Sequence, residues 1–195
     1  MPKPFIPRDS WAVKAAKEGY RARSVYKLME LDEKFHLLRN GMQVLDIGAA
    51  PGSWLQYTAR RVGEAGRVLG IDLQTIEPVH ANVVTVVCDS TDESALRAAI
   101  AAAHLHRIEL ILSDIAPNTS GIKDIDQWRS IELSQHVLSI ARTHLAPHGT
   151  LVMKVFRGAD FDDFLALCRE SFNRVTIATV KASRDRSREV YVVCR

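Results

Sequence analysis

Three carboxylates stand at the ends of apolar runs along this 195-residue chain, where the strands of a parallel sheet are expected to end. Asp72 lies about twenty residues after a glycine-containing turn, the spacing at which an acid can accept hydrogen bonds from both hydroxyls of a ribose. Asp89 ends the next run, in position to bind an exocyclic amine such as that of adenine, and Asp114 ends the run after it. Because the carboxyl ends of parallel strands meet at one edge of a sheet, the acids predict a nucleoside site there.

A lysine interrupts the following apolar run. Lys154 has three apolar residues before it and two after it, so we expect it in a strand that is apolar on both sides. Lysine is rarely buried without a partner. Asp114 is the natural partner, since it ends the neighbouring strand in the usual order, while Glu189 offers a second carboxylate and Lys27 a second cation. The pattern predicts that two ammonium groups and two carboxylates converge.

The turn that precedes Asp72 is built from small residues. The stretch V-L-D-I-G-A-A-P-G-S-W at 44–54 is typical of a buried strand that passes through a short loop into a helix. Gly48 and Gly52 leave room for a ligand near the backbone. The loop lacks the G-x-G-x-x-G spacing, and Pro51 has no amide to offer a pyrophosphate. It therefore favours a nucleoside cofactor without a phosphate bridge, such as S-adenosylmethionine, although an ordinary strand-to-helix turn is the alternative.

Strand-like and helical patterns alternate along the rest of the chain. An amphipathic helix is expected through about Phe35, with Ser24 near its start. Strands are expected at 43–47, 67–71, 83–88, 109–113, 150–156, 174–180 and 190–194, and helices at 53–62, 92–103, 127–145 and 159–172. Ser90 or Thr91 is available as N-cap of the helix at 92–103, and Pro147 with Gly149 marks the stop of the helix at 127–145.

These elements predict an α/β fold in a single domain that spans residues 1–195. Only residues 181–189 separate the last two strands, which is too short for a helical crossover, so an antiparallel closing pair is expected. The expected architecture is Rossmann-like, with a mostly parallel seven-stranded sheet, an antiparallel C-terminal strand and helices on both faces. This is the usual plan of S-adenosylmethionine-dependent methyltransferases. The likeness at this point is one of fold and not of function.

Positive charge is concentrated near the N-terminus. The formal net charge is +3, yet residues 1–27 alone carry seven Lys or Arg side chains against two acids. A basic arm on a slightly acidic body favours a polyanionic partner, and residues 1–22 are the part expected to contact RNA. The alternative is a solvated helix face that aids solubility.

Other features narrow the setting. No apolar run approaches the length of a membrane span, and the N-terminus lacks the apolar core of a secretory leader. Three cysteines lie far apart without C-x-x-C spacing, so no metal site is expected. Cys88 and Cys194 lie in apolar runs and are expected to be buried free thiols, as in a reducing compartment. The cytoplasm is the expected location.

Five motifs together resemble the FtsJ/RrmJ family of ribosomal RNA 2′-O-ribose methyltransferases, in particular the type that acts on a uridine of the large subunit. The motifs are R-S-x-Y-K at 23–27, D-x-G-A-A-P-G-x-W at 46–54, S-D-x-A-P-N at 113–118, K-V-F at 154–156 and S-R-E-x-Y at 187–191. The likeness extends from about residue 21 to residue 193. A chance match of all five in this order is implausible.

The resemblance implies a site and its ligands. The family's Lys-Asp-Lys-Glu tetrad falls on Lys27, Asp114, Lys154 and Glu189, and its S-adenosylmethionine contacts fall on Gly52, Trp54, Asp72, Asp89 and Asp114. Ser53 departs from the family, whose members commonly carry a second glycine there. The resemblance also implies a monomer that methylates ribosomal RNA, with RNA contacted by the basic arm and by the face around the active site.

Lys154 is the expected proton acceptor in the transfer of a methyl group from a sulfonium to a ribose hydroxyl. Burial and the cation of Lys27 favour a neutral amine, which can act as a base, whereas Asp114 and Glu189 favour the ammonium. An ammonium would instead orient the hydroxyl and stabilise the developing oxyanion. The sequence leaves both roles open.

Other functions share some of these features. A 2′-O-methyltransferase for tRNA or another RNA would use the same tetrad, whereas a nicotinamide dehydrogenase would prefer the glycines that the loop lacks. A base-directed amino methyltransferase would want an aromatic residue after Pro117, where this chain has Asn118. A non-catalytic RNA-binding factor in ribosome assembly would need the basic arm but not a complete tetrad.

Overall fold

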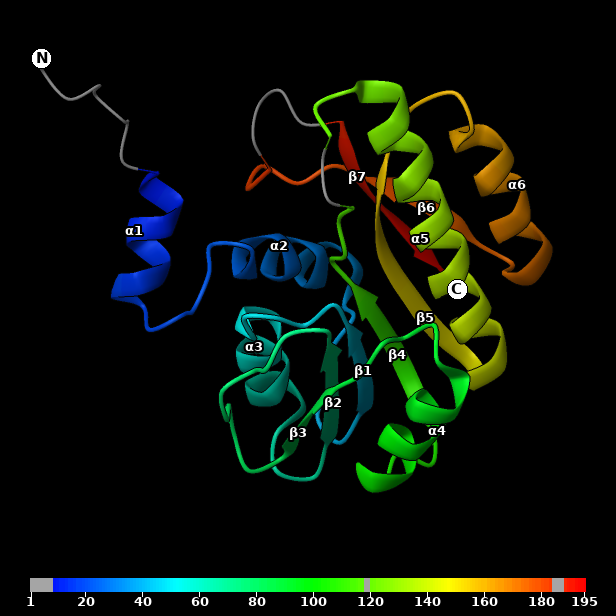
Figure 1. Ribbon diagram of the computed structural model, residues 1–195. Coiled ribbons are helices and arrows are strands. Elements are labelled where there is room, and N and C mark those ends of the chain that lie inside the picture. Colours follow the sequence, from blue (N-terminus) through cyan, green and yellow to red (C-terminus); the bar gives the residue numbers. More distant parts are fainter. Residues whose placement is uncertain (1–8, 118–119, 184–187) are drawn as a thin grey trace, which may run out of the picture.

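A seven-stranded sheet forms the centre of the molecule in a computed structural model, which describes residues 9–117, 120–183 and 188–195 (Figure 1). Its spatial order is β3-β2-β1-β4-β5-β7-β6. The strands are β1 (Gln43–Ile47), β2 (Arg67–Asp72), β3 (Val83–Val87), β4 (Ile108–Ser113), β5 (Leu145–Phe156), β6 (Val175–Ala178) and β7 (Glu189–Cys194). Strands β1 to β5 are parallel to one another, whereas β7 runs antiparallel to both β5 and β6.

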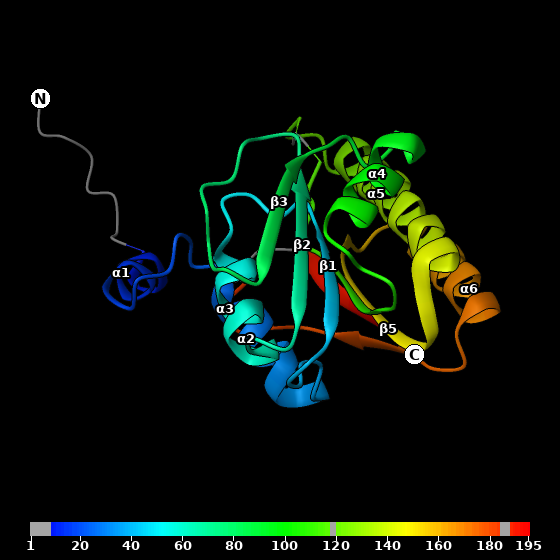
Figure 2. The same cartoon turned by 90° about the horizontal axis from the view of Figure 1, so that it is seen from below.

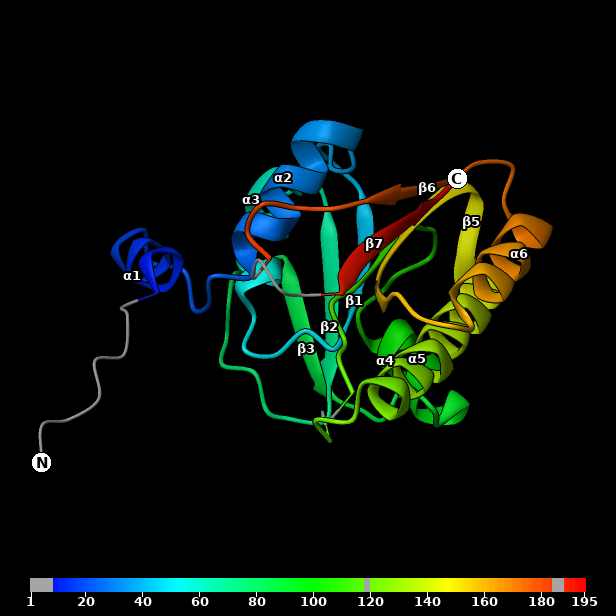
Figure 3. The same cartoon turned by 90° about the horizontal axis from the view of Figure 1, so that it is seen from above.

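Helices cover both faces of the sheet. They are α1 (Ser10–Lys17), α2 (Val25–Phe35), α3 (Ser53–Val62), α4 (Glu93–Ala102), α5 (Lys123–His144) and α6 (Phe161–Ser171). The two end-on views show α2 and α3 on one face and α4, α5 and α6 on the other (Figures 2 and 3). Helix α1 lies at the side of this body, where Trp11 packs on Tyr26 with ring centroids 5.0 Å apart.

The two-faced covering explains why the strands read as continuous apolar runs. Leu45 and Ile47 of β1 pack into the core beneath α4, α5 and α6, whereas Val44 packs into the core beneath α2 and α3. Successive side chains of a strand point to opposite faces, so a strand covered on both sides needs apolar residues at every position. Polar groups are thereby displaced to the strand ends, where the site residues lie.

A buried carboxylate joins the two helices that lie next to the site. Asp32 of α2 is 3% exposed and accepts hydrogen bonds from the Leu38 amide at 2.9 Å and the Tyr57 hydroxyl at 2.9 Å. Its Oδ2 atom is also 3.0 Å from Nε of Arg61. Both Tyr57 and Arg61 belong to α3, so Asp32 fixes α2 against the helix that follows the glycine-containing loop.

The predicted sheet is confirmed, including its antiparallel C-terminal strand. What the sequence did not predict is that β7 inserts between β5 and β6 instead of lying at the edge. Strand β5 also begins earlier than expected. Helix α5 ends at His144, and residues 145–149, of which Leu145 pairs with Ile108, already belong to the strand. The described residues contain no helix long and apolar enough to cross a membrane.

Two expected helix starts differ in detail. Asp92, and neither Ser90 nor Thr91, caps α4, because its carboxylate accepts hydrogen bonds from two amides of the first turn. Ser24 precedes α2 as expected but makes no side-chain cap; its hydroxyl instead lies 2.9 Å from that of Ser53. Cys88, Cys168 and Cys194 are free and buried, as expected for the first and last of them.

Candidate active site

Buried Lys154 and half-buried Asp114 form an ion pair at the carboxyl edge of the sheet. Strands β4 and β5 run side by side with Ser113 opposite Met153, so the next residue of each strand lies at the same level. Nζ of Lys154 is 3.0 Å from Oδ1 of Asp114 and also donates to the Asp114 main-chain carbonyl. Lys154 is 8% exposed. The structure therefore brings together the pair that burial of a lysine led us to expect.

Lys27 and Glu189 extend this pair into a row of four charged groups. Lys27 projects from α2, and its Nζ atom lies 2.6 Å from Oε1 of Glu189 and 3.9 Å from Oδ1 of Asp114. Glu189 is the first residue of β7 and pairs with Phe156 at the end of β5. Four elements far apart in the sequence thus supply a row of alternating sign, Glu189–Lys27–Asp114–Lys154, with formal charges that cancel.

Tyr191 belongs to the same cluster, although the sequence analysis gave it no role. It is fully buried opposite Lys154 in the β5–β7 register, and its hydroxyl donates to Oδ1 of Asp114 at 2.7 Å. Burial, reinforced by the neighbouring carboxylates, raises the pKa of Tyr191 well above its usual value, so the hydroxyl remains a donor. The available signal was its spacing: residues two apart in a strand share a face, and Glu189 precedes it by two.

The small-residue loop approaches Asp72 closely. Gly48 and Gly52 have φ angles of +75° and +100°, a region that disfavours side chains. A Cβ atom on Gly48 would lie 2.3 Å from Ile115. Oδ2 of Asp72 accepts a hydrogen bond from the Ala50 amide at 2.9 Å, which fixes the carboxylate beside the loop.

Trp54 and Asp89 occupy different environments. Trp54 is 3% exposed, and its indole donates to the Ser24 carbonyl at 2.8 Å, so the ring ties α3 to the segment before α2. Asp89 is exposed at the end of β3 and accepts hydrogen bonds from the amide and hydroxyl of Thr91 at 2.9 and 2.8 Å. These bonds lower the pKa of Asp89, so its carboxylate is charged at the sheet edge.

Asp46 is a second residue that the sequence analysis did not single out. It lies in β1 directly before the loop, is 1% exposed, and within the described part of the chain its Oδ2 atom has no hydrogen-bond partner. Burial raises the pKa of Asp46 well above the usual value, and Asp114 and Asp72 add to the effect. A buried acid among apolar strand residues was the signal. An unpartnered oxygen here suits a polar or cationic ligand group.

The basic arm is partly engaged in contacts within the protein. Arg23 forms an ion pair with Asp9 at 2.5 Å, and Lys14 lies 3.8 Å from Glu18. The guanidinium of Arg21 donates to three main-chain carbonyls, including that of Pro51 in the loop. Lys17 is exposed. Lys3 and Arg8 of the expected arm, and Asn118 and Ser187 of the motifs, lie outside the described residues.

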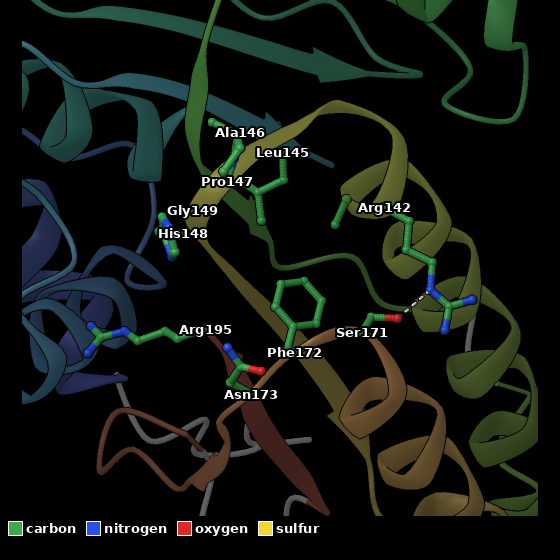
Figure 4. Close-up of a pocket in the computed structure, with 11 residues that line it drawn as sticks. Arg142, Leu145, Ala146, Pro147, His148, Gly149, Ser171, Phe172, Asn173 and Arg195 are labelled. Carbon is green, nitrogen blue, oxygen red and sulfur yellow. Dashed lines mark hydrogen bonds between the residues drawn. The ribbon is translucent and has the colours of Figure 1, made fainter.

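A hollow of about 290 Å³ lies at the opposite edge of the sheet (Figure 4). It is bounded by the end of α5, the start of β5 and the end of α6, and Arg142 at its rim donates to the Ser171 hydroxyl at 2.7 Å. None of the expected site residues lines it. Among the residues that the structure describes, no cluster of His, Cys, Asp and Glu suits a metal ion.

Comparison with known proteins gives three informative matches. The model of the family described as FtsJ-like methyltransferase matches residues 20–195 of this chain. A ribosomal RNA large subunit methyltransferase E from Methanothrix thermoacetophila is 46% identical over 186 residues, which are 95% of this chain and 71% of that protein. A crystal structure of a ribosomal RNA methyltransferase from Plasmodium falciparum has a TM-score of 0.80 at 28% identity and covers 90% of this chain and 97% of its own.

A further match is more distant and concerns the fold alone. Fibrillarin from Aeropyrum pernix, crystallised with natively bound S-adenosyl-L-methionine, has a TM-score of 0.58 at 15% identity. The likeness covers 82% of this chain and 68% of the fibrillarin chain. The Rossmann-like architecture of the sheet is thus shared with a protein of quite different sequence.

Asp126, near the start of α5, holds the residues just before that helix through its carboxylate. Asp126 accepts hydrogen bonds from the amide and hydroxyl of Ser120 at 2.6 and 2.8 Å and from the Gly121 amide at 3.2 Å. The Ser120 amide is the main cause of the lowered pKa of Asp126. A lowered folded-state pKa stabilises the fold above the unfolded value, and this contribution is lost as the pH falls through the folded value.

We therefore expect an NMR titration midpoint for Asp126 below its usual 3.8. On acidification below that value, the free energy of unfolding should fall less steeply in Asp126→Asn than in the unsubstituted protein. Asp124→Asn, an exposed acid in the same helix turn, serves as the matched control. Equal slopes for Asp126→Asn and the unsubstituted protein would contradict the role given to these hydrogen bonds.

Proposed function

Because this chain belongs to the FtsJ-like methyltransferase family, we propose that it transfers a methyl group from S-adenosylmethionine to a ribose 2′-hydroxyl of RNA. The observation that carries the proposal is the row Glu189–Lys27–Asp114–Lys154 at the carboxyl edge of the sheet, where ligands of such folds bind. All four groups come from one chain, which supports a single-domain enzyme that acts as a monomer.

The residues around the loop fit S-adenosylmethionine. Asp72 is held in place by two amides and can accept the ribose hydroxyls of the cofactor, while Asp89 offers a charged acceptor for the adenine amine. Among the described residues, Oδ2 of Asp46 has no hydrogen-bond partner, and a Cβ atom at Gly48 or Gly52 would meet neighbouring atoms. When bound, S-adenosylmethionine supplies a methyl group that a positive sulfonium has already activated.

The protein must then align the 2′-hydroxyl and handle one proton. The Asp114 main-chain carbonyl accepts a hydrogen bond from Nζ of Lys154, and Oδ1 of the Asp114 carboxylate lies 3.0 Å from the same nitrogen. A neutral amine whose two N–H groups face these two oxygens keeps its lone pair for the hydroxyl proton. We propose Lys154 as the proton acceptor, which supplies about 10²–10⁴-fold in rate, beside an alignment effect on the order of 7–11 kcal/mol in favourable cases.

Lys27, Glu189 and Tyr191 act on this pair from the other side. Lys27 stands between the two carboxylates, where its charge offsets theirs. Glu189 holds Lys27 in place, and the Tyr191 hydroxyl orients Oδ1 of Asp114. Asp114 thereby presents a fixed carboxylate to Lys154 instead of a mobile one.

For the substrate, we propose large-subunit ribosomal RNA, since the relative from Methanothrix thermoacetophila is named for large-subunit RNA. The resemblance of the five motifs supports a uridine as the target nucleotide. The exposed lysines of α1 provide a cationic surface for the RNA next to the α2–α3 side of the site. This surface suits free RNA and RNA assembled in the subunit alike. We place the reaction in the cytoplasm, where the buried free thiols remain reduced.

Purified protein should methylate large-subunit RNA from cells that lack the enzyme, with label from methyl-labelled S-adenosylmethionine found in alkali-resistant dinucleotides. A methylated 2′-oxygen cannot attack the neighbouring phosphate, so hydrolysis stops at that linkage. Transfer RNA serves as the parallel substrate. Label released entirely as mononucleotides would indicate base methylation, and label in transfer RNA alone would contradict the ribosomal target.

Substitutions in the ion pair should separate chemistry from cofactor binding. Lys154→Ala should reduce turnover about 10²–10⁴-fold while calorimetric affinity for S-adenosylhomocysteine persists. Asp114→Ala should lower both, because Asp114 is expected to contact the cofactor as well as Lys154. Lys34→Ala, an exposed lysine of α2, is the control and should retain both. Substantial turnover by Lys154→Ala would overturn the role assigned to this amine.

The double substitution Lys14→Gln and Lys17→Gln should weaken RNA binding and flatten its salt dependence by about one to two units of log K per log salt concentration. Each lysine that neutralises a phosphate releases a counterion, and both of these α1 lysines are exposed. Filter binding at several salt concentrations measures the slope. An unchanged slope would show that these lysines only aid solubility.

A further inference from the structure

We propose that Arg21 is a positioning residue that holds the two cofactor-binding loops together, and that this, instead of RNA contact, is its function. The inference rests on the proposed function, because it assumes that the loop 48–52 and Asp72 receive S-adenosylmethionine. It assigns to the end of the basic arm a task that its charge alone did not indicate.

The guanidinium of Arg21 bridges two loops that the sequence separates by about one βαβ unit. Nη1 donates to the Pro51 carbonyl at 3.0 Å and to the Glu77 carbonyl at 2.8 Å. Nη2 donates to the Pro78 carbonyl at 2.7 Å. Pro51 belongs to the small-residue loop after β1, and Glu77 and Pro78 belong to the loop that begins after Asp72 at the end of β2.

This contact fixes the shape of the loop at its closest approach to Arg21. The peptide group between Pro51 and Gly52 is planar, so its carbonyl and its amide point in opposite directions. Arg21 donates to the Pro51 carbonyl of this peptide, while the Gly52 amide donates to the Ala49 carbonyl at 2.7 Å. Both ends of the peptide are therefore held, and a Cβ atom on Gly52 would lie 2.8 Å from Nη1.

The segment around Arg21 is itself anchored on α3. The Arg21 amide donates to Oε1 of Gln56 at 2.9 Å, and Nε2 of Gln56 donates to the Gly19 carbonyl at 3.0 Å. The guanidinium is held from its own main chain as well as by the three carbonyls. Its position follows from the fold and does not require RNA.

The chemistry of the side chain favours this reading over a phosphate contact. A guanidinium has five N–H donors, and three are used by main-chain carbonyls. Lys14 and Lys17 differ, because they lie on α1 and no hydrogen bond joins them to the described part of either loop. Lysine is a poor substitute for Arg21, since a compact ammonium cannot span carbonyls from two loops with the same geometry.

The test measures affinity for S-adenosylhomocysteine by calorimetry with the whole protein and no RNA. Arg21→Met should weaken binding at least about tenfold, because three hydrogen bonds from a charged donor are lost, and Arg21→Lys should give an intermediate loss. Arg97→Met, an exposed arginine of α4, is the matched control and should bind within about twofold of the unsubstituted protein.

Kinetics provide a readout that general loss of structure would not reproduce. In Arg21→Lys, the KM for S-adenosylmethionine should rise while kcat at saturating cofactor stays within about threefold. Lys17→Met should show the opposite pattern, with weaker RNA binding and unchanged affinity for S-adenosylhomocysteine. Thermal unfolding without ligand identifies any variant that fails to fold. If Arg21→Met does not fold, the affinity measured for Arg21→Lys decides the outcome.

Unchanged affinity for S-adenosylhomocysteine in both Arg21 variants would overturn the inference, and weakened RNA binding alone would return Arg21 to the RNA-contacting arm. Failure of the unsubstituted protein to bind S-adenosylhomocysteine would instead contradict the proposed function. The two failures are therefore distinguishable.

Discussion

The ion pair between buried Lys154 and half-buried Asp114 is the constraint on which the rest of the site depends. An isolated charge is costly to bury. Nζ of Lys154 lies 3.0 Å from Oδ1 of Asp114, and displacement of Asp114 would leave the lysine charge without this partner among apolar strand residues. The sheet must therefore place the ends of β4 and β5 at one level, as their register does.

Asp114 in turn requires elements from both ends of the chain. Lys27 reaches it from α2, before the first strand, and Tyr191 reaches it from β7, after the last helix. Strand β7 can deliver Tyr191 and Glu189 because it lies directly against β5, with Lys154 opposite Tyr191. Had β7 formed the outer edge beyond β6, neither side chain would face the pair. The insertion of β7 is thus a requirement of the site as well as of the sheet.

The physics of burial explains which parts could be predicted from sequence. Lys154 could be paired with Asp114 because a lysine in a two-sided apolar strand needs a carboxylate, and strand ends supply one. The turn at 48–52 was predictable because glycine permits positive φ angles and proline restricts the backbone locally. These arguments use only neighbours in the sequence or a general rule of sheet edges.

The features that were missed depend on partners that no local pattern reveals. A tyrosine in an apolar strand is ordinary core, and only the β5–β7 register makes the hydroxyl of Tyr191 a partner of Asp114. Arg21 was counted as arm charge because main-chain carbonyls, which accept its hydrogen bonds, carry no residue-specific signal. The cap of α4 was misassigned among adjacent polar residues, where Asp92 competes with Ser90 and Thr91 for the same amides.

The segment that leads into α2 connects the cofactor side of the site to the charged row. The Ser24 carbonyl accepts a hydrogen bond from the Trp54 indole, and the Ser24 hydroxyl is hydrogen-bonded to that of Ser53. Ser53 and Trp54 are the first two residues of the helix that follows the loop. Three residues after Ser24 the same segment supplies Lys27. These contacts link the start of α3, one helical turn away, to the cation beside Asp114. Because methyl transfer depends on alignment within a fraction of an ångström, the N-terminal segment determines the geometry of the reaction as much as the sheet does.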